Sequence, residues 1–131
     1  MSIINYQFSI MKENIVRDKS FNFAVRIVNL SKYLVDQKRE FILSKQILRS
    51  GTAIGALVRE SEQAESKADF IHKLSISLKE ANETDYWLDL LYKTDYLTEQ
   101  EYQSIKIDII ELIKLLTAII KTSKINKYPS S

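Results

Sequence analysis

The chain contains almost no residues that interrupt a helix. Its 131 residues include two glycines and one proline, and the proline is Pro129. Glycine and proline mark most turns and strand ends in globular proteins. Long uninterrupted stretches therefore remain, and their apolar residues recur every three or four positions, which is the spacing of one helix face. Together these features predict an all-α protein.

The apolar spacing predicts four long helices. The first is expected over residues 20–37 and the second over residues 41–63. Ser66 and Thr98 are expected to precede the third and fourth helices, because each is followed three positions later by an acidic residue, as in a capping box. The linkers are short, so neighbouring helices must be antiparallel. We therefore expect an up-down-up-down four-helix bundle.

The segment before the first helix has a different pattern. Residues 1–17 are expected to form an N-terminal extension or arm, ahead of the bundle at 18–125 and a C-terminal tail at 126–131. We interpret this segment either as an arm that packs on the bundle or pairs with another chain, or as a disordered extension. The first reading rests on apolar residues that alternate with polar ones, which is a strand-like period of two: Ile4, Tyr6, Phe8 and Ile10.

The third and fourth helices carry more apolar residues than one core face requires. The surplus includes Trp87, Ile107 and Ile110. A helix that is apolar on several sides is buried on several sides. The sequence therefore predicts a homo-oligomer.

Composition excludes several classes of protein. With 45% hydrophobic and 27% charged residues, the chain resembles an ordinary globular domain. It has no cysteine, so disulfides and thiolate metal sites are excluded. No apolar run approaches the roughly 18 residues of a membrane span, and the start lacks the basic and apolar regions of a secretory signal. A cytoplasmic protein without membrane contact is expected.

Charge is unevenly distributed along the chain. Residues 1–59 carry ten Lys and Arg against four Asp and Glu, whereas residues 60–111 carry five against thirteen. Residues 112–131 carry four Lys and no acidic residue. Such segregation can build a basic face opposite an acidic one. The alternative is that these charges only solvate helix faces.

Both glycines, Gly51 and Gly55, lie four positions apart inside the second helix. Glycine in a helix interior costs about 1 kcal/mol relative to alanine, so a packing role is expected. On the buried face, a missing side chain lets another backbone approach closely. A phosphate-binding loop is the rejected alternative, because no strand precedes the glycines and no Gly-Lys-Ser/Thr sequence follows them.

The antiparallel register also predicts pairs of charges. If the turn between the second and third helices centres near residue 65, Arg49 lies level with Glu80 and Glu83, and Glu60 lies level with residues 69–73. We expect Arg49 to form an inter-helix ion pair. Such a pair fixes register more than it adds stability.

Two sequence blocks resemble a known family. The run from Ser44 to Glu60 and the run from Asp69 to Leu88 are similar to the four-helix bundle family encoded by intervening sequences in bacterial 23S rRNA genes. The positions that match are Ser44, Gln46, Leu48, Arg49, Ser50, Ile54, Gly55, Ala56 and Glu60 in the first block, and Asp69, Phe70, Lys73, Leu74, Lys79, Glu80, Ala81, Glu83, Tyr86, Trp87 and Leu88 in the second.

The resemblance extends more loosely from residue 11 to residue 124. It departs from the family pattern at Leu57, where the family has Asn, and at Ser61, where it has Ala or Gly. Family members are similar in fold and assembly to the accessory variability protein of diversity-generating retroelements, a homopentamer associated with nucleic acid and reverse transcriptase. The resemblance therefore implies a homopentamer. It implies structural signature roles for Gly51, Gly55, Glu60, Glu80, Glu83 and Trp87.

No catalytic constellation is present. A di-metal bundle centre needs a Glu-x-x-His motif on each of two helices, but the only histidine is His72. Asp69, three residues before it, is better explained as a capping residue. Nucleophilic catalysis also lacks a glycine elbow around any serine. We therefore expect no enzyme, no bound metal and no cofactor.

The leading functional hypothesis is an oligomeric bundle that binds RNA or other nucleic acid through phosphate contacts. No known recognition motif is present, so contact with specific bases is not expected. The alternative is a protein-interaction scaffold that engages a partner through residues 60–111 or the N-terminal arm. The candidate nucleic-acid-binding residues are Lys32, Lys38, Arg39, Lys45, Arg49, Lys121, Lys124 and Lys127, with Lys12, Arg17 and Lys19 near the last three.

Overall fold

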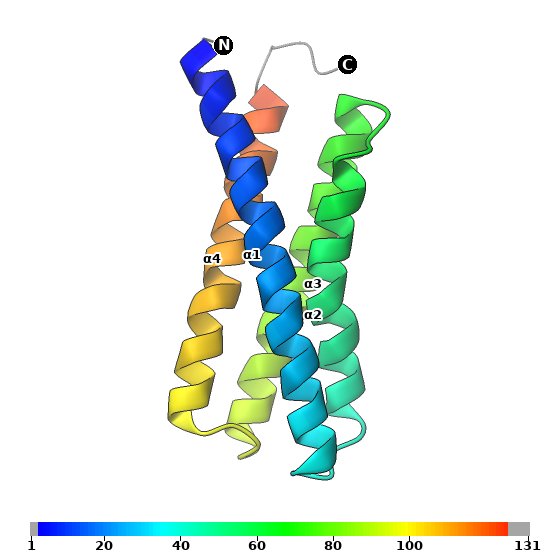
Figure 1. Cartoon of the computed structure of the whole chain (residues 1–131), viewed down its shortest axis with the longest axis vertical. Coiled ribbons are helices and arrows are strands. Elements are labelled where there is room, and N and C mark those ends of the chain that lie inside the picture. Colours follow the sequence, from blue (N-terminus) through cyan, green and yellow to red (C-terminus); the bar gives the residue numbers. More distant parts are fainter. Residues whose placement is uncertain (1–2, 126–131) are drawn as a thin grey trace.

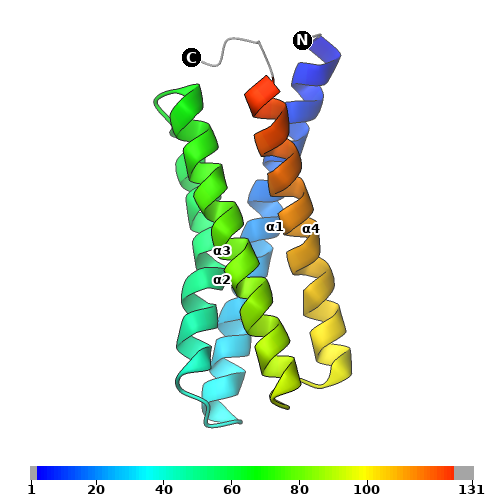
Figure 2. The same ribbon diagram turned by 180° about the vertical axis from the view of Figure 1, so that it is seen from behind.

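The computed structural model describes residues 3–125, which form four helices and no strand (Figures 1 and 2). They are α1 (Ile3–Asp36), α2 (Leu43–Ser61), α3 (Lys67–Lys93) and α4 (Glu99–Ile125). Each helix packs on two neighbours, in the order α1, α2, α3, α4 and back to α1. The turns alternate between the two ends of the molecule, so the predicted up-down-up-down bundle is confirmed.

The first helix is much longer than expected. It begins at Ile3 and not near Ser20, so the strand-like pattern predicted for the first ten residues is wrong for the backbone from Ile3 onward. Ser20 is buried in mid-helix, where its hydroxyl donates to the Arg17 carbonyl oxygen at 3.1 Å. No glycine or proline interrupts residues 1–36. Once a helix exists, each further residue adds a hydrogen bond at little cost, so the helix extends.

Both predicted capping pairs are present. The Ser66 hydroxyl accepts a hydrogen bond from the Asp69 backbone N–H at 3.0 Å, before α3. At the start of α4, the Glu101 N–H donates to the Thr98 hydroxyl at 3.1 Å, and the Thr98 N–H donates to the Glu101 carboxylate at 2.9 Å. This reciprocal pair is a complete capping box. α2 lacks such a box and begins two residues later than expected, at Leu43.

The core lies along the axis between the four helices. Buried aliphatic side chains come from every helix, and α1 adds the aromatic ring of Phe23. None of the described buried polar side-chain atoms lacks a partner. None of the described helices is both long and apolar enough to cross a membrane. The largest fully buried side chains are Val16, Phe23, Ile27 and Leu34 of α1, Ile47 and Ile54 of α2, Leu74, Leu88 and Leu91 of α3, and Ile109, Leu112 and Leu116 of α4.

Small hydroxyl side chains occupy the interface between α2 and α3. The Thr84 hydroxyl donates to the Ser50 hydroxyl at 2.9 Å, and the Ser77 hydroxyl donates to the Ile54 carbonyl oxygen at the same distance. The paired residues lie at nearly equal distances along the chain from a turn centred near residue 65, as the sequence predicted. The register predicted for α2 and α3 is therefore confirmed.

The turns use left-handed backbone at residues that are not glycine. Arg39, after α1, has φ 56°, and Asp95, after α3, has φ 67°. At the end of α3, the Tyr96 N–H donates to the Leu91 carbonyl oxygen at 2.9 Å, which completes a Schellman motif. Neither glycine has positive φ. The glycines therefore serve packing and not chain reversal.

The glycines bring α2 close to α1. A Cβ atom added at Gly51 would lie 2.8 Å from two side-chain carbons of Ile27, and one added at Gly55 would lie 3.1 Å from the Ser20 carbonyl oxygen. Gly51 is buried as predicted, whereas Gly55 is half-buried beneath a hollow between α1 and α2. The close approach at both glycines is to α1.

Gly55→Leu should prevent the bundle from packing. The new side chain would have to displace the α1 backbone at Ser20, and overpacking costs about 1–3 kcal/mol or more. We expect a loss at or above the upper end of that range in the free energy of unfolding, measured by urea denaturation followed by circular dichroism. Ala56→Leu is the matched control, because Ala56 is the next residue along α2 and its side chain is exposed. A Gly55→Leu variant as stable as the native chain would contradict this role.

Candidate nucleic-acid interface

The predicted basic residues lie at opposite ends of the bundle. Lys32, Lys38, Arg39 and Lys45 belong to the end of α1, the α1–α2 turn and the start of α2. This set is called the α1–α2 end below. Lys121 and Lys124 lie in the last turns of α4, at the end that also holds the α1 N-terminus (Figure 1). Lys127 lies outside the described residues.

Many of the basic residues of the first half of the chain form ion pairs with acidic residues of the middle part. Arg17 of α1 lies 3.7 Å from Glu62, after α2, and Lys19 of α1 lies 3.0 Å from Glu111 of α4. In each pair a basic residue of the first half of the chain meets an acidic residue of the middle part. The two signs of charge therefore cross-link neighbouring helices.

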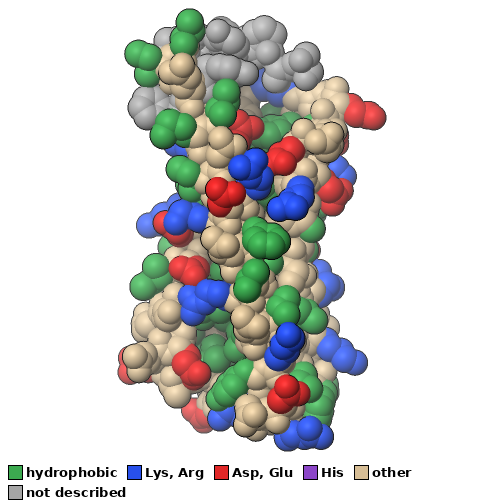
Figure 3. Space-filling model, viewed as in Figure 1, with side chains coloured by type: hydrophobic (Ala, Val, Ile, Leu, Met, Phe, Trp, Pro, Cys, Tyr) green, Lys and Arg blue, Asp and Glu red, His purple; other side chains and the backbone are tan. Residues whose placement is uncertain are grey.

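A second ion pair joins α1 to α4 and is more extensive than the first. Arg26 lies 2.7 Å from the Asp108 carboxylate and also donates to the Ser104 hydroxyl at 3.1 Å. On the face shown in Figure 3, basic and acidic side chains are interspersed along the bundle. This distribution differs from the continuous basic face that segregation made possible.

Arg49 forms the predicted ion pair with both candidate carboxylates. Its guanidinium donates to Glu80 at 2.9 Å and also to Glu83. The Trp87 indole N–H donates to Glu83 at 3.0 Å. Hydrogen bonds from Trp87 and Arg49 together lower the pKa of Glu83 below its usual value, although burial opposes this. Four residues that match the family pattern thus form one contact between α2 and α3.

The second predicted α2–α3 pair is also present. Lys73 lies 3.3 Å from Glu60. Leu57, which replaces the family's Asn, is half-buried on the same helix as Glu60. The three acidic signature residues and Trp87 therefore hold α2 against α3, whereas the two glycines pack on α1. Both terminal guanidinium nitrogens of Arg49 are already engaged.

The α1–α2 end retains cations without a carboxylate partner. None of Lys32, Lys38, Arg39 and Lys45 forms an ion pair with a described residue. Of the two acidic residues at this end, Asp36 is exposed at the end of α1 and Glu40 is buried in the turn. The Glu40 carboxylate accepts hydrogen bonds from the backbone N–H groups of Ile42 and Ser44, at 3.3 and 2.8 Å, and so caps α2. The turn therefore presents positive charge to solvent.

Two aromatic rings accompany these cations, and the sequence analysis did not identify them. The Lys38 ammonium lies 5.8 Å from the centre of the Tyr33 ring, and the Arg39 guanidinium lies 5.0 Å from the centre of the Phe41 ring. Phe41 is 45% exposed. Basic residues combined with exposed rings are typical of surfaces that bind single-stranded nucleic acid. The sequence signal was the adjacency of Phe41 to Lys38 and Arg39.

A polar cluster between α3 and α4 was also missed. Lys106 contacts the carboxylates of Asp85 and Asp89, and the Tyr102 hydroxyl donates to Asp89 at 2.6 Å. Burial opposes ionisation of Asp89, but hydrogen bonds from Tyr102 and Lys106 outweigh it and lower the pKa of Asp89. The ion pairs likewise raise the pKa of Lys106 well above its usual range, against its burial. Every charged group here has an internal partner, so the cluster joins helices.

The described residues offer no evident metal site. Residues 3–125 contain no group of three His, Cys, Asp or Glu side chains arranged to hold a metal ion. His72 is exposed on α3, and the Asp69 carboxylate accepts from the Glu65 N–H at 3.2 Å. The absence of catalysis and of cofactors stays a prediction.

Two similarities connect this geometry to known proteins. The family described as 23S rRNA-intervening sequence protein matches residues 12–118. A protein of unknown function from the S23 ribosomal protein family of Bacteroides thetaiotaomicron VPI-5482 has a similar crystal structure, with 64% sequence identity and a TM-score of 0.84. The similarity covers 85% of this chain and 99% of that one. No curated protein matches the chain significantly.

The pH dependence of stability tests the Asp89 cluster. The pKa of Asp89 is lower in the folded chain, so the ionised group stabilises the fold above its unfolded pKa of about 3.9, and this is lost as pH falls through the folded value. Asp89→Asn should lower the free energy of unfolding at pH 7, and the difference from the native chain should shrink below about pH 4. Urea denaturation at pH 7 and pH 3 measures both.

The matched control is Asp36→Asn, because Asp36 is exposed and has no ion pair with a described residue. It should change stability little at either pH. An equal loss for Asp89→Asn at pH 7 and pH 3 would show that the carboxylate charge is not what stabilises the cluster.

Proposed function

Because the chain belongs to the 23S rRNA-intervening sequence protein family, we propose that it is a non-enzymatic, homo-oligomeric four-helix bundle that binds RNA through phosphate contacts. The family model covers most of the chain, including every residue of the two signature blocks. The proposal places the RNA contact at the α1–α2 end.

The observation that carries the proposal is the set of unpaired cations at that end. Elsewhere many basic side chains have carboxylate partners in a neighbouring helix, whereas Lys32, Lys38, Arg39 and Lys45 have none among the described residues. Cations without internal partners can bind phosphate groups and release their counterions, which drives association with nucleic acid. The exposed Phe41 ring adds a surface on which an unpaired base can stack.

Oligomerisation increases the strength of this contact. Four cations on one chain support only weak, salt-sensitive binding. Several copies engage one RNA at once, and each further contact is then intramolecular. We propose a homopentamer, as the family resemblance implies, and the apolar residues exposed on α1 and α4 support association between copies.

The second candidate function is a protein-interaction scaffold. Its supporting observation is the exposed apolar surface of α1, which includes Ile3, Ile4 and Met11. The acidic residues 60–111 support this reading less, because many of their carboxylates are engaged within the bundle. Recovery of a defined protein partner that survives nuclease treatment would favour it.

Binding of 23S rRNA fragments across a salt series tests the proposed contact. The native chain should bind at low ionic strength and lose affinity as salt increases. Substituting Lys32, Lys38 and Lys45 by Gln should weaken binding and reduce the slope of log affinity against log salt by about two for each protomer in contact. Fluorescence anisotropy with labelled RNA measures the slope.

The matched control removes three lysines at the opposite end, Lys12, Lys121 and Lys124, also by Gln. This variant should retain most of the native salt slope. If the two triple variants lose affinity equally, the RNA contact is not at the α1–α2 end. If the native chain shows no salt-dependent binding even at low ionic strength, the proposed function itself fails.

The size of the particle tests the assembly separately. Light scattering coupled to size-exclusion chromatography should give a mass five times that of the 15.3 kDa chain. A mass equal to one chain at micromolar concentration would contradict the homo-oligomer.

A further inference from the structure

The exposed apolar residues are concentrated on one helix. Of the twelve large apolar side chains that are exposed among the described residues, seven belong to α1. α1 therefore has apolar residues on its outer side as well as facing the core, and a helix with this property is buried on more than one side. The seven are Ile3, Ile4, Ile10, Met11, Ile15, Phe21 and Val25.

The middle of α1 presents a regular outer face. Its members are Met11, Ile15, Asp18, Phe21 and Val25, separated by steps of four, three, three and four residues. Such spacing places side chains on one side of a helix. All five are exposed, and the Asp18 side chain is 71% exposed. The α1 outer face, as this set is called below, thus has one negative charge between apolar residues.

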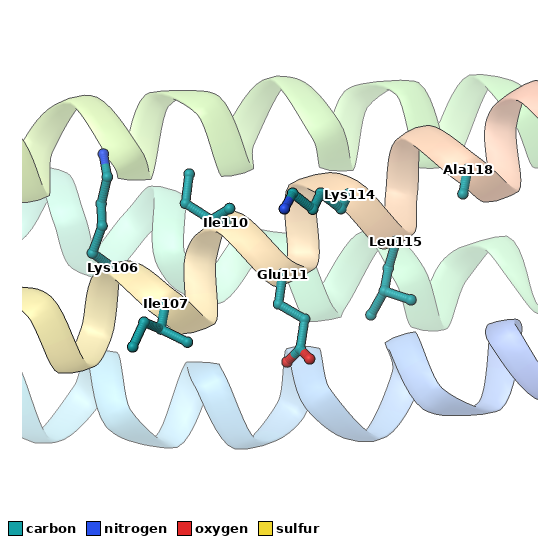
Figure 4. Close-up of a pocket in the computed structure, with 7 residues that line it drawn as sticks. All are labelled: Lys106, Ile107, Ile110, Glu111, Lys114, Leu115 and Ala118. Atoms are coloured by element: carbon teal, nitrogen blue, oxygen red, sulfur yellow. The ribbon is translucent and has the colours of Figure 1, made fainter.

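The outer side of α4 carries a groove with the opposite charge pattern. The groove has a volume of about 520 Å³ and lies between two rows of side chains (Figure 4). Lys106, Ile110 and Lys114 form the row on the α3 side, and Ile107, Glu111 and Leu115 form the row on the α1 side, with Ala118 at one end. Rows of this kind, four residues apart, form the grooves into which the ridges of another helix pack.

Among the described residues, one charge in the α4 groove has no ion-pair partner. Lys106 is held by Asp85 and Asp89, and Glu111 is held by Lys19. Lys114 has no ion pair with a described residue. It lies among apolar residues one turn away, Ile110 and Ala118, and two turns away, Ile107. The groove therefore presents a single available positive charge at its centre.

The α1 outer face and the α4 groove are complementary in charge and in spacing. In each, one charge is flanked by apolar residues one and two helical turns away. Within the described part of the chain, the ion pair of Asp18 is with its neighbour in sequence, Arg17, at 3.4 Å and in an exposed position. Such contacts contribute little stability, so the Asp18 carboxylate remains available to a partner.

We propose that the α1 outer face of one copy docks in the α4 groove of a second copy, with Asp18 opposite Lys114. The inference rests on the proposed homo-oligomer and names its interface. Two different surfaces meet, so the contact is heterologous, and such contacts close into rings when the rotation between copies allows it. α1 and α4 are neighbours in the bundle, so the two surfaces point outward from adjacent corners and each copy has one of each.

Charge reversal at the two central positions tests the contact. Asp18→Lys and Lys114→Asp should each place like charges together and weaken assembly roughly tenfold or more. The variant that carries both reversals restores an opposite-charge pair in every contact and should recover the native particle mass. Analytical ultracentrifugation over a concentration series measures all three.

Matched controls reverse charge at exposed positions outside both surfaces, Asp36→Lys and Lys79→Asp, and should leave assembly unchanged. Circular dichroism confirms that each variant is folded. If the native chain is monomeric, the homo-oligomer itself fails. If the native chain is oligomeric but the single reversals have no more effect than the controls, or the double variant does not recover, the chain assembles through another surface and this inference is overturned.

Discussion

The close contact between α1 and α2 at the two glycines is the constraint on which the rest of the bundle depends. Where a Cβ on Gly51 would lie, the branched side chain of Ile27 fills the space and is fully buried. The chain accepts the intrinsic cost of glycine inside a helix and places Arg39 and Asp95, not glycine, in left-handed turns. Glycine is therefore found where two helices pack closely and not where the chain reverses direction. The contact also fixes how α2 follows the α1–α2 turn, and therefore which cations that turn presents.

Inter-helix contacts were largely predictable from the sequence because short linkers fix the level of one helix against the next. Counting residues outward from the α2–α3 turn placed Arg49 level with Glu80 and Glu83, and Glu60 level with residues 69–73. The structure has ion pairs between Arg49 and both glutamates and between Glu60 and Lys73. It could not say on which side of α2 each neighbour lies. Charge segregation was therefore compatible with separate faces, whereas the structure uses many of these charges as links between helices.

The N-terminal segment and the aromatic rings show what local patterns leave out. Alternation of apolar residues over the first ten positions is weak evidence for a strand when an adjoining helix can simply continue. The exposed apolar residues of this segment are also compatible with a helical period. That period can be recognised only once it is known which side of the helix faces the core. Phe41 was missed for a related reason: the sequence predicts an apolar residue at a helix start, but only the turn geometry, with Glu40 directed inward, leaves the ring exposed beside Arg39.

The proposed assembly and the proposed RNA contact use different parts of the molecule, and this makes them compatible. Docking between α1 and α4 occupies the sides of the bundle, whereas the unpaired cations lie at one end. If copies are related by rotation about an axis near the helix direction, every α1–α2 end faces the same side of the particle. Phosphate binding is weak for a few cations and strong for many, because each neutralised phosphate contributes through released counterions. A surface with modest charge on one chain then becomes an extended RNA contact only when several copies are arranged side by side. RNA binding and assembly should therefore strengthen each other, although different mutations should disrupt each of them.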